Sequence, residues 1–303
     1  MLRHFVPRND HLIRGSLITL SKKLNILVTG ATGFIGRHVL DRLREENVSV
    51  TVLSRDLSRL SDLKNCYDHA IEMNIADASD NIYELTGSPD ILIHLACEGL
   101  PDYYSLHHYE QVLPHQYTFL KSMISGGLKS ILVTGTCFEY GMQNGCLSED
   151  APAMPDNPYG FAKDTLHRQL LYLNKEIPFV LTWCRLFYVW GEGQSEKSLY
   201  SQLSAAIARG DRIFNMSEGD QIRDYLHVKD IADYLVQFAL KNNKSVTVNI
   251  GSGRPISIRK LIENWIELNH WNIELNPGFY PYPTYEPMEF WADTTRLKQL
   301  LNQ

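Results

Sequence analysis

The sequence has no long apolar run and no concentration of basic residues. No stretch approaches the roughly 20 consecutive apolar residues that a membrane-spanning helix needs, so we expect no membrane partner. Lys and Arg number 29 against 35 Asp and Glu, which gives a net charge of −6. Because the basic residues form no stripe, a nucleic-acid partner is not expected either.

Cysteine pairs at metal-binding or redox spacing are also missing. The five cysteines are Cys66, Cys97, Cys137, Cys146 and Cys184, and no two of them form a Cys-x-x-Cys motif. An odd number of isolated cysteines is typical of free thiols in a reducing compartment, which predicts a cytoplasmic protein. His107 and His108 have no cluster of Cys, His or Asp around them at ligand spacing, so we predict no metal site.

Residues 1–23 are basic but lack both a continuous apolar core and a small-residue cleavage site. We therefore interpret them as an N-terminal extension and not as a signal peptide. Two explanations stay open: a start codon placed upstream of the folded domain, or a short arm packed on that domain.

Strand-like and helical segments alternate through the first two thirds of the chain. Near-continuous apolar runs predict strands at 24–29, 48–53, 69–73, 90–96, 130–135 and 178–185, and helical periodicity lies near 34–46, 106–125 and 159–175. Such runs are typical of parallel strands that helices cover on both faces. The alternation predicts an α/β fold with a doubly wound parallel sheet of the Rossmann type.

The pattern loosens after residue 186. Helices are predicted near 196–209, 228–241 and 257–269, with a strand at 246–251. We predict a dinucleotide-binding domain formed by 24–185 and about 224–255. A smaller C-terminal α/β substrate-binding domain would consist of about 186–223 and 256–303.

The stretch 27-LVTGATGFIGRHVLDRL-43 places three glycines at intervals of three, between a strand and a helix. Gly30 allows a tight turn, Gly33 lets the backbone approach a pyrophosphate, and Gly36 lets the helix pack closely on the sheet. The helix N-terminus offers unpaired N–H groups and a positive dipole end to an anion. The dinucleotide contacts predicted here are Gly30, Thr32, Gly33, Phe34, Ile35 and Gly36.

The end of the next strand predicts which dinucleotide binds. NAD-binding proteins place an acidic residue there, which binds the ribose 2′-hydroxyl. This chain reads 50-VTVLSRD-56, so Ser54 and Arg55 stand at the tip, and a hydroxyl followed by a guanidinium suits a 2′-phosphate. We predict NADP(H) as the preferred cofactor. NAD(H) is the alternative, with Asp56 as the ribose-binding acid if the strand ends two residues later.

Tyr159 and Lys163 lie four residues apart in 156-DNPYGFAKDTLHRQL-170, on one face of a predicted helix. We expect the lysine ammonium to lower the pKa of the phenol by favouring the phenolate. Thr136 lies at the C-terminal end of the fifth strand, where doubly wound sheets bind their ligands. Its hydroxyl could donate to a substrate carbonyl while Tyr159 delivers or removes the proton.

With these motifs, the chain resembles the extended short-chain dehydrogenase/reductase family of sugar-nucleotide epimerases, dehydratases and ketoreductases. The matching stretches are 30-GATGFIG-36, 94-HLA-96, 133-VTGTCFEYG-141, 158-PYGFAK-163, 185-RLFYVWGEGQ-194 and 223-RDYLHVKDIA-232. The resemblance implies the family's Ser/Thr–Tyr–Lys roles for Thr136, Tyr159 and Lys163, with Lys163 also holding the nicotinamide ribose. The further contacts that it implies are Asn74, Ile75, Leu95 and Ala96 for the cofactor and Arg223 for the substrate pyrophosphate.

Departures from the family pattern narrow the choice among the family's reactions. The 4,6-dehydratases of the family carry Asp-Glu directly after the catalytic Thr, whereas this chain has Cys137 and Phe138, so dehydration is not expected. Tyr188 replaces a usual Asn, so the sugar contacts should differ from those of common epimerases. Glu139 replaces a usual apolar residue, and we favour a solvated loop carboxylate over a contact with a sugar hydroxyl.

A 4-ketoreductase and a 4-epimerase remain. An epimerase recycles one bound NAD, whereas a reductase consumes NADPH at each turnover, so the predicted 2′-phosphate site favours the reductase. The stretches 135-GTCFEYG-141, 159-YGFAKDTLHRQL-170 and 277-PGFYPYPTYEPMEFW-291 also resemble a subgroup of sugar-nucleotide reductases in surface-polysaccharide pathways, such as those of the lipopolysaccharide O-antigen. We predict an NADPH-dependent oxidoreductase of deoxysugar biosynthesis. It would reduce the C4 ketone of a dTDP- or CDP-linked 4-keto-6-deoxyhexose, and an NAD-dependent nucleotide-sugar 4-epimerase is the alternative.

Other predictions concern the substrate and the oligomer. The candidate substrate contacts are Arg223, Tyr188, Phe214 and Tyr285, with plain core packing as the alternative for the last two.

The resemblance implies a homodimer through helices 106–125 and 159–175, in which Leu166, Leu170 and Leu173 face either the partner or the interior of one subunit. A non-catalytic dinucleotide-binding regulator is the rival class, and Thr136, Tyr159 and Lys163 together argue against it.

Overall fold

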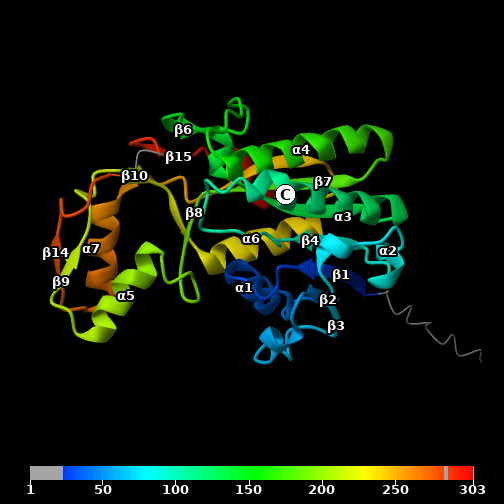
Figure 1. Ribbon diagram of the computed structural model, residues 1–303, viewed down its shortest axis with the longest axis horizontal. Coiled ribbons are helices and arrows are strands. Elements are labelled where there is room, and N and C mark those ends of the chain that lie inside the picture. The colour runs from blue at the N-terminus through cyan, green and yellow to red at the C-terminus, as the bar shows by residue number, and fades with distance from the viewer. Residues whose placement is uncertain (1–22, 283–285, 303) are drawn as a thin grey trace, which may run out of the picture.

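A seven-stranded parallel sheet forms the centre of the protein (Figure 1). The computed structural model describes residues 23–282 and 286–302. The strands are β1 (Leu24–Thr29), β2 (Val48–Ser54), β3 (His69–Glu72), β4 (Ile91–His94), β5 (Ser130–Thr136), β7 (Val180–Leu186) and β12 (Val246–Ile250), in the order β12-β7-β5-β4-β1-β2-β3. The order reverses between β1 and β4, which is the arrangement of a doubly wound sheet. The predicted Rossmann-type fold is confirmed.

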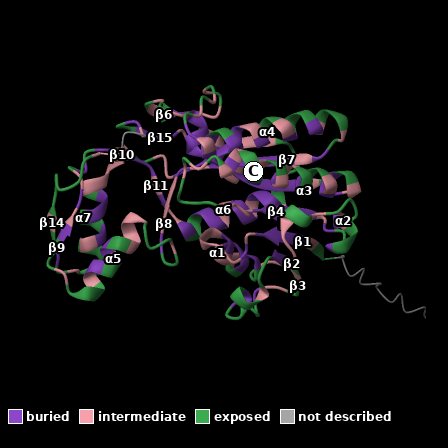
Figure 2. Ribbon diagram, viewed as in Figure 1, coloured by how far each residue is buried: buried purple, intermediate pink, exposed green. Residues whose placement is uncertain are grey.

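Helices cover both faces of this sheet. One face carries α1 (Phe34–Leu43), α6 (Val228–Lys241) and α8 (Thr295–Leu301), and the other carries α2 (Ile82–Leu85), α3 (Leu113–Gly126) and α4 (Pro158–Glu176). Successive strand residues enter opposite cores: Ile26 and Val28 pack with α1 and α6, while Leu27 packs with α3 and α4. Because both faces are covered, the inner strands β4, β5 and β7 are almost wholly buried and read as continuous apolar runs, whereas the edge strand β3 has no buried residue (Figure 2).

The leucines of α4 belong to the core of a single chain. Leu166, Leu170 and Leu173 are buried together with residues of α3 and the sheet. Their apolar character is therefore explained by packing inside one subunit, and the homodimer stays a prediction.

A second, smaller lobe lies at the left of Figure 1. Its elements are α5 (Leu199–Arg209), α7 (Ile258–Asn269), β9 (Ile213–Asn215) and β14 (Glu274–Asn276), and they enclose a separate apolar cluster. Phe214 is buried in that cluster, which core packing explains, and its contact with a nucleotide base stays a prediction. The α8 helix lies within the predicted range 256–303 but packs its Leu297 into the core beside the central sheet. The domain division itself stays a prediction.

Short elements connect the two lobes and rim the sheet. They are β6 (Gly145–Leu147), β8 (Tyr188–Trp190), β10 (Ile222–Arg223), β11 (Tyr225–His227), β13 (Ile256–Ser257) and β15 (Phe290–Ala292), with short helical turns η1 (Leu57–Leu60), η2 (Ile75–Asp77), η3 (His108–Val112) and η4 (Cys137–Tyr140). The predicted helix 106–125 is thus a π-helical turn, η3, continued by α3.

Some sequence predictions fall outside the described residues. These are the structure of the extension up to residue 22 and the role of Tyr285. Within the described part of the chain, no helix is both long and apolar enough to cross a bilayer. All five cysteines are free thiols, as predicted.

Candidate active site

The turn between β1 and α1 is built so tightly that two of its glycines admit no side chain. Gly30 has a φ of +73°, and a Cβ there would stand 2.6 Å from the backbone of Leu95 and Ala96. A Cβ on Gly36 would lie 2.1 Å from the carbonyl oxygen of Gly30. Gly36 therefore lets α1 close on the turn itself, rather than on the sheet as the sequence suggested. Gly33 is the N-cap of α1 and forms no side-chain cap, which leaves N–H groups of the first turn for a ligand.

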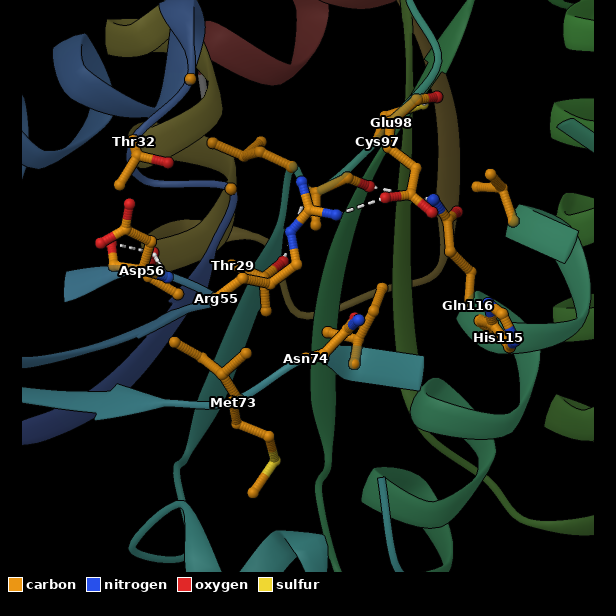
Figure 3. Close-up of a pocket in the computed structure, with 18 of the residues that line it drawn as sticks. Thr29, Thr32, Arg55, Asp56, Met73, Asn74, Cys97, Glu98, His115 and Gln116 are labelled. Atoms are coloured by element: carbon orange, nitrogen blue, oxygen red, sulfur yellow. Dashed lines mark hydrogen bonds and ion pairs between the residues drawn. The ribbon is translucent and has the colours of Figure 1, made fainter. Parts of the chain in front are cut away.

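A cavity of about 350 Å³ opens over this turn (Figure 3). The predicted cofactor contacts that line it are Gly30, Thr32, Gly33, Ser54, Arg55, Asn74, Ile75, Leu95 and Ala96. They come from the ends of four neighbouring strands, which meet at one edge of the sheet.

Phe34, Ile35 and Gly36 do not line the cavity. The Phe34 ring packs edge-on against His38 at 6.0 Å, and Ile35 packs against the core. These residues can contact a ligand through the backbone N–H groups of the first turn of α1, and not through their side chains. Sequence reasoning missed the following wall residues: Arg59, Met73, Cys97, Glu98, Val112, His115 and Gln116. Only Cys97 and Glu98 had a signal, since they directly follow the matched 94-HLA-96.

At the tip of β2, the side chains that the sequence offered to a cofactor already have partners within the protein. The strand ends at Ser54, whose hydroxyl donates to the carbonyl oxygen of Asp56 at 3.0 Å. The Asp56 carboxylate caps η1 and accepts from the N–H of Ser58 at 2.9 Å. Arg55 extends across the cavity to the carboxylate of Glu98, as Figure 3 shows, and Glu98 also lies 3.4 Å from His107. The predicted phosphate-binding guanidinium thus already has an anionic partner.

Thr136, Tyr159 and Lys163 lie together beside the cavity and not on its wall. Thr136 ends β5, and α4 starts at Pro158 because Asn157 caps it by accepting from the N–H of Gly160 at 2.9 Å. All three side chains are buried. Tyr159 and Lys163 line a small space together with Cys97, which also lines the large cavity. The trio therefore adjoins the predicted cofactor site.

The electrostatics of Tyr159 differ from the prediction. Burial raises the pKa of Tyr159 well above its usual value of 10.0, and a hydrogen bond with the Thr136 side chain lowers it only in part. The Lys163 ammonium donates to the carbonyl oxygen of Thr134 at 2.8 Å, and its charge does not offset the effect of burial on the pKa of the phenol. Burial, followed by the charge of Lys163, instead lowers the pKa of His94 to about 3. The expectation that Lys163 makes Tyr159 acidic was wrong for the protein alone, and Tyr159 holds its proton at neutral pH.

Arg223 and Tyr188 lie together near Cys137, but the guanidinium of Arg223 is engaged. Arg223 is buried and donates to the carboxylate of Glu286 at 2.9 Å and to the carbonyl oxygen of Ile222 at 2.8 Å. Its guanidinium lies 5.7 Å from the centre of the Tyr188 ring. A substrate phosphate that used Arg223 would share it with Glu286 or displace that carboxylate.

Glu139 is not the solvated carboxylate that the sequence suggested. It is fully buried, and it pairs with Arg185 at 2.7 Å beneath Thr136. Its enclosure also excludes direct contact with a sugar hydroxyl. The expectation of a solvated carboxylate failed because a buried charge needs a partner, and the partner, Arg185, is distant in sequence.

The sequence profile of the NAD dependent epimerase/dehydratase family matches residues 26–251, which include the glycine turn, Thr136, Tyr159, Lys163 and Arg223. The chain belongs to this family. The membership agrees with the resemblance to extended short-chain dehydrogenases/reductases.

Family relatives carry out different reactions. The chain is 28% identical over 274 residues to a dTDP-6-deoxy-L-talose 4-dehydrogenase (NAD(+)) from Aggregatibacter actinomycetemcomitans, covering 89% of this chain and 99% of the relative. It is also 28% identical over 265 residues to a UDP-glucose 4-epimerase from Halalkalibacterium halodurans, covering 78% of each. A UDP-N-acetylglucosamine 4-epimerase from Methanobrevibacter ruminantium, solved with UDP-N-acetylmuramic acid, superposes with a TM-score of 0.79 at 21% identity over 92% of each chain. This last likeness supports the fold alone.

The cavity fits the dinucleotide that the family name implies. Gly30 and Gly33 lie on its wall without side chains that would fill it, and no side chain caps the helix that starts there. It extends from Arg55 past Asn74 to Cys97 and Gln116, beside the buried Tyr159 and Lys163. An extended ligand with an anionic middle matches this layout.

Proposed function

We propose that the protein reduces the C4 ketone of a nucleoside-diphosphate 4-keto-6-deoxyhexose, linked to dTDP or CDP. The observation that carries this proposal is the buried pair of Thr136 and Tyr159 beside a cavity of about 350 Å³ at the glycine turn. A phenol that holds its proton at neutral pH is suited to donate it to a carbonyl oxygen that gains negative charge. The relative named dTDP-6-deoxy-L-talose 4-dehydrogenase supports redox chemistry at C4 of a dTDP-linked 6-deoxysugar, and its named reaction, oxidation of a C4 hydroxyl, is the reverse of this reduction.

Each residue of the trio has a separate task in this reaction. The bound reduced nicotinamide supplies the hydride to C4. Thr136 and Tyr159 hold the carbonyl oxygen between their hydroxyls, and Tyr159 donates its proton to that oxygen. Lys163 is fixed by the carbonyl oxygen of Thr134, 2.8 Å away, and stabilises the phenolate that is left. The surrounding burial excludes water from the reacting atoms.

For the substrate we propose contacts from Arg223 and Tyr188. Their buried cluster lies beside Cys137, the residue that follows Thr136, so it is close to the reacting centre. A diphosphate carries more charge than Glu286 and accepts from a guanidinium in two places. We expect it to displace the carboxylate when the substrate binds.

For the cofactor we propose NADP(H), with Arg55 as the ligand of the 2′-phosphate. The support is the place of Arg55 on the cavity wall at the end of β2. Against it stand the ion pair with Glu98 and the NAD(+) named for the talose dehydrogenase. These two observations favour the second candidate, a 4-epimerase that keeps one NAD bound and recycles it.

The decisive experiment mixes purified protein with NADPH or NADH and a dTDP- or CDP-4-keto-6-deoxyglucose. A reductase oxidises the nicotinamide in proportion to substrate, which its absorbance reports, and releases a 4-hydroxy sugar nucleotide. Tyr159→Phe should lower kcat by about 100-fold or more, because the proton donor is lost. An epimerase would instead interconvert a pair of 4-hydroxy epimers with no net change in nicotinamide absorbance, and that result would reject the reductase.

A further inference from the structure

The buried carboxylate of Glu139 lies directly beneath the proposed catalytic threonine. Its Oε1 accepts from the backbone N–H of Thr136 at 2.9 Å and from the indole N–H of Trp183 at 3.1 Å. Its Oε2 accepts from Nε of Arg185 at 2.7 Å. All of these groups are buried, so the interactions are shielded from solvent.

The side chains of Thr136 and Glu139 cap the short turn η4 reciprocally, each accepting a hydrogen bond from a backbone N–H of the turn. The Thr136 hydroxyl accepts from the N–H of Phe138 at 3.3 Å, while the Glu139 side chain accepts from the N–H of Thr136. The arrangement is a capping box on η4. Because Thr136 is held from its backbone and its side chain, its hydroxyl has a defined place relative to Tyr159.

A wider network fixes Glu139 in turn. Arg185 donates to the hydroxyl of Tyr140 at 3.1 Å and lies over the Tyr140 ring at 4.7 Å. The Tyr140 hydroxyl donates to Asn249 on β12 at 2.7 Å. The turn after β5 is thereby tied to β7 and β12, two rigid strands of the sheet.

Gly135 provides the space for this contact. A Cβ there would lie 2.3 Å from both Oε1 of Glu139 and Nε1 of Trp183. The φ of Gly135 does not lie in the left-handed region. Glycine is needed here because it has no Cβ, and not because the chain makes an unusual turn.

We infer that Glu139 is a positioning residue, whose carboxylate holds the hydroxyl of Thr136 in the geometry needed for reduction. It touches neither substrate nor cofactor and acts only through Thr136. The inference rests on the proposed function for the reaction that it serves. An apolar residue at this position could fill the volume but could not accept the N–H of Thr136.

The test compares two double variants that differ only in this hydrogen-bond acceptor. Both carry Arg185→Met, so that no unpaired guanidinium stays buried. Glu139→Gln/Arg185→Met keeps an oxygen for the Thr136 N–H, whereas Glu139→Leu/Arg185→Met removes it. Circular dichroism and melting curves establish that each variant folds.

We expect the leucine variant to lose about 10- to 100-fold in kcat, because small displacements of a reacting group have effects of that size. The KM for the sugar nucleotide and the Kd for the dinucleotide should stay within about 2-fold, and the glutamine variant should recover kcat to within about 3-fold of the wild type. In a Thr136→Ala background the two variants should differ by less than about 2-fold, because no hydroxyl is left to position. Equal kcat of the two variants, or an undiminished difference in that background, would overturn the inference.

A substrate-free measurement separates this inference from the proposed function. Amide hydrogen exchange at residues 136–138 should be faster in the leucine variant than in the glutamine variant, with β7 and β12 unchanged. If the wild type reduces no 4-keto sugar, the proposed function fails while the exchange contrast still decides whether Glu139 holds Thr136. Identical exchange at 136–138 in both variants would refute the inference, whatever the reaction is.

Discussion

Arg55 offers the sharpest test of cofactor choice, through the variant Arg55→Leu. The Arg55 side chain is 57% exposed and that of Glu98 is 38% exposed. An ion pair this open to water contributes only about 0–1 kcal/mol, so a 2′-phosphate should compete with Glu98 for the guanidinium. A charge-assisted hydrogen bond contributes about 1.5–3 kcal/mol, and the exposure of Arg55 favours the lower end. Removing Arg55 should therefore weaken NADPH binding by about 10- to 30-fold and NADH binding by less than about 2-fold.

The assay is titration of each reduced dinucleotide into the protein without sugar substrate, followed by nicotinamide fluorescence or calorimetry. Arg59→Leu is the matched control, since Arg59 is an exposed arginine on the same cavity wall and its removal changes the net charge equally. Glu98→Gln should strengthen NADPH binding by up to about 5-fold, because Arg55 is released from its partner. Equal losses of NADPH and NADH affinity in Arg55→Leu, or no loss at all, would refute the 2′-phosphate site and favour NAD.

Further predictions concern the turn, the proton and the core. Gly36→Ala should lower the melting temperature and weaken dinucleotide binding at least about 10-fold, because the new Cβ would stand 2.1 Å from the Gly30 oxygen; unchanged calorimetric binding would contradict this. Because burial raises the pKa of Tyr159 well above its usual value, kcat for reduction should stay flat from about pH 7 to 9, while oxidation, which needs the phenolate, should accelerate with pH. A reduction rate that falls across that range would show a more acidic phenol. Leu170→Ala should lower the free energy of unfolding in urea by about 2–5 kcal/mol, since Leu170 is fully buried, whereas Leu171→Ala, at a position 43% exposed, should change it by less than about 0.5 kcal/mol.

The central sheet could be predicted because its signals are local. Strands that are buried on both faces are apolar throughout, and the observed strands begin and end within a few residues of the predicted ones. The long helices α4 and α6 were found for the same reason, since their apolar periodicity and caps lie within their own segments. The α8 helix was missed because it is short and buries little more than Leu297.

The motif residues of the site could also be predicted, but their interactions could not. Spacing and strand ends identified the glycine turn, Thr136, Tyr159 and Lys163, and the structure brings them to one edge of the sheet. Interactions depend on groups far away in sequence. Glu98 lies 43 residues from Arg55, Arg185 lies 46 residues from Glu139, and Glu286 lies 63 residues from Arg223.

The sequence by itself determined the sheet, the dinucleotide turn and the identity of the reactive side chains, because each depends on residue types at short range. Only the tertiary structure decided the charge state and orientation of those side chains. Burial holds the proton on Tyr159, the ammonium of Lys163 donates to the carbonyl of Thr134, and Arg185 pairs with the buried Glu139 beneath Thr136. The physical reason is that desolvation and ion pairing depend on what surrounds a group in space, and a folded chain surrounds it with residues from distant segments.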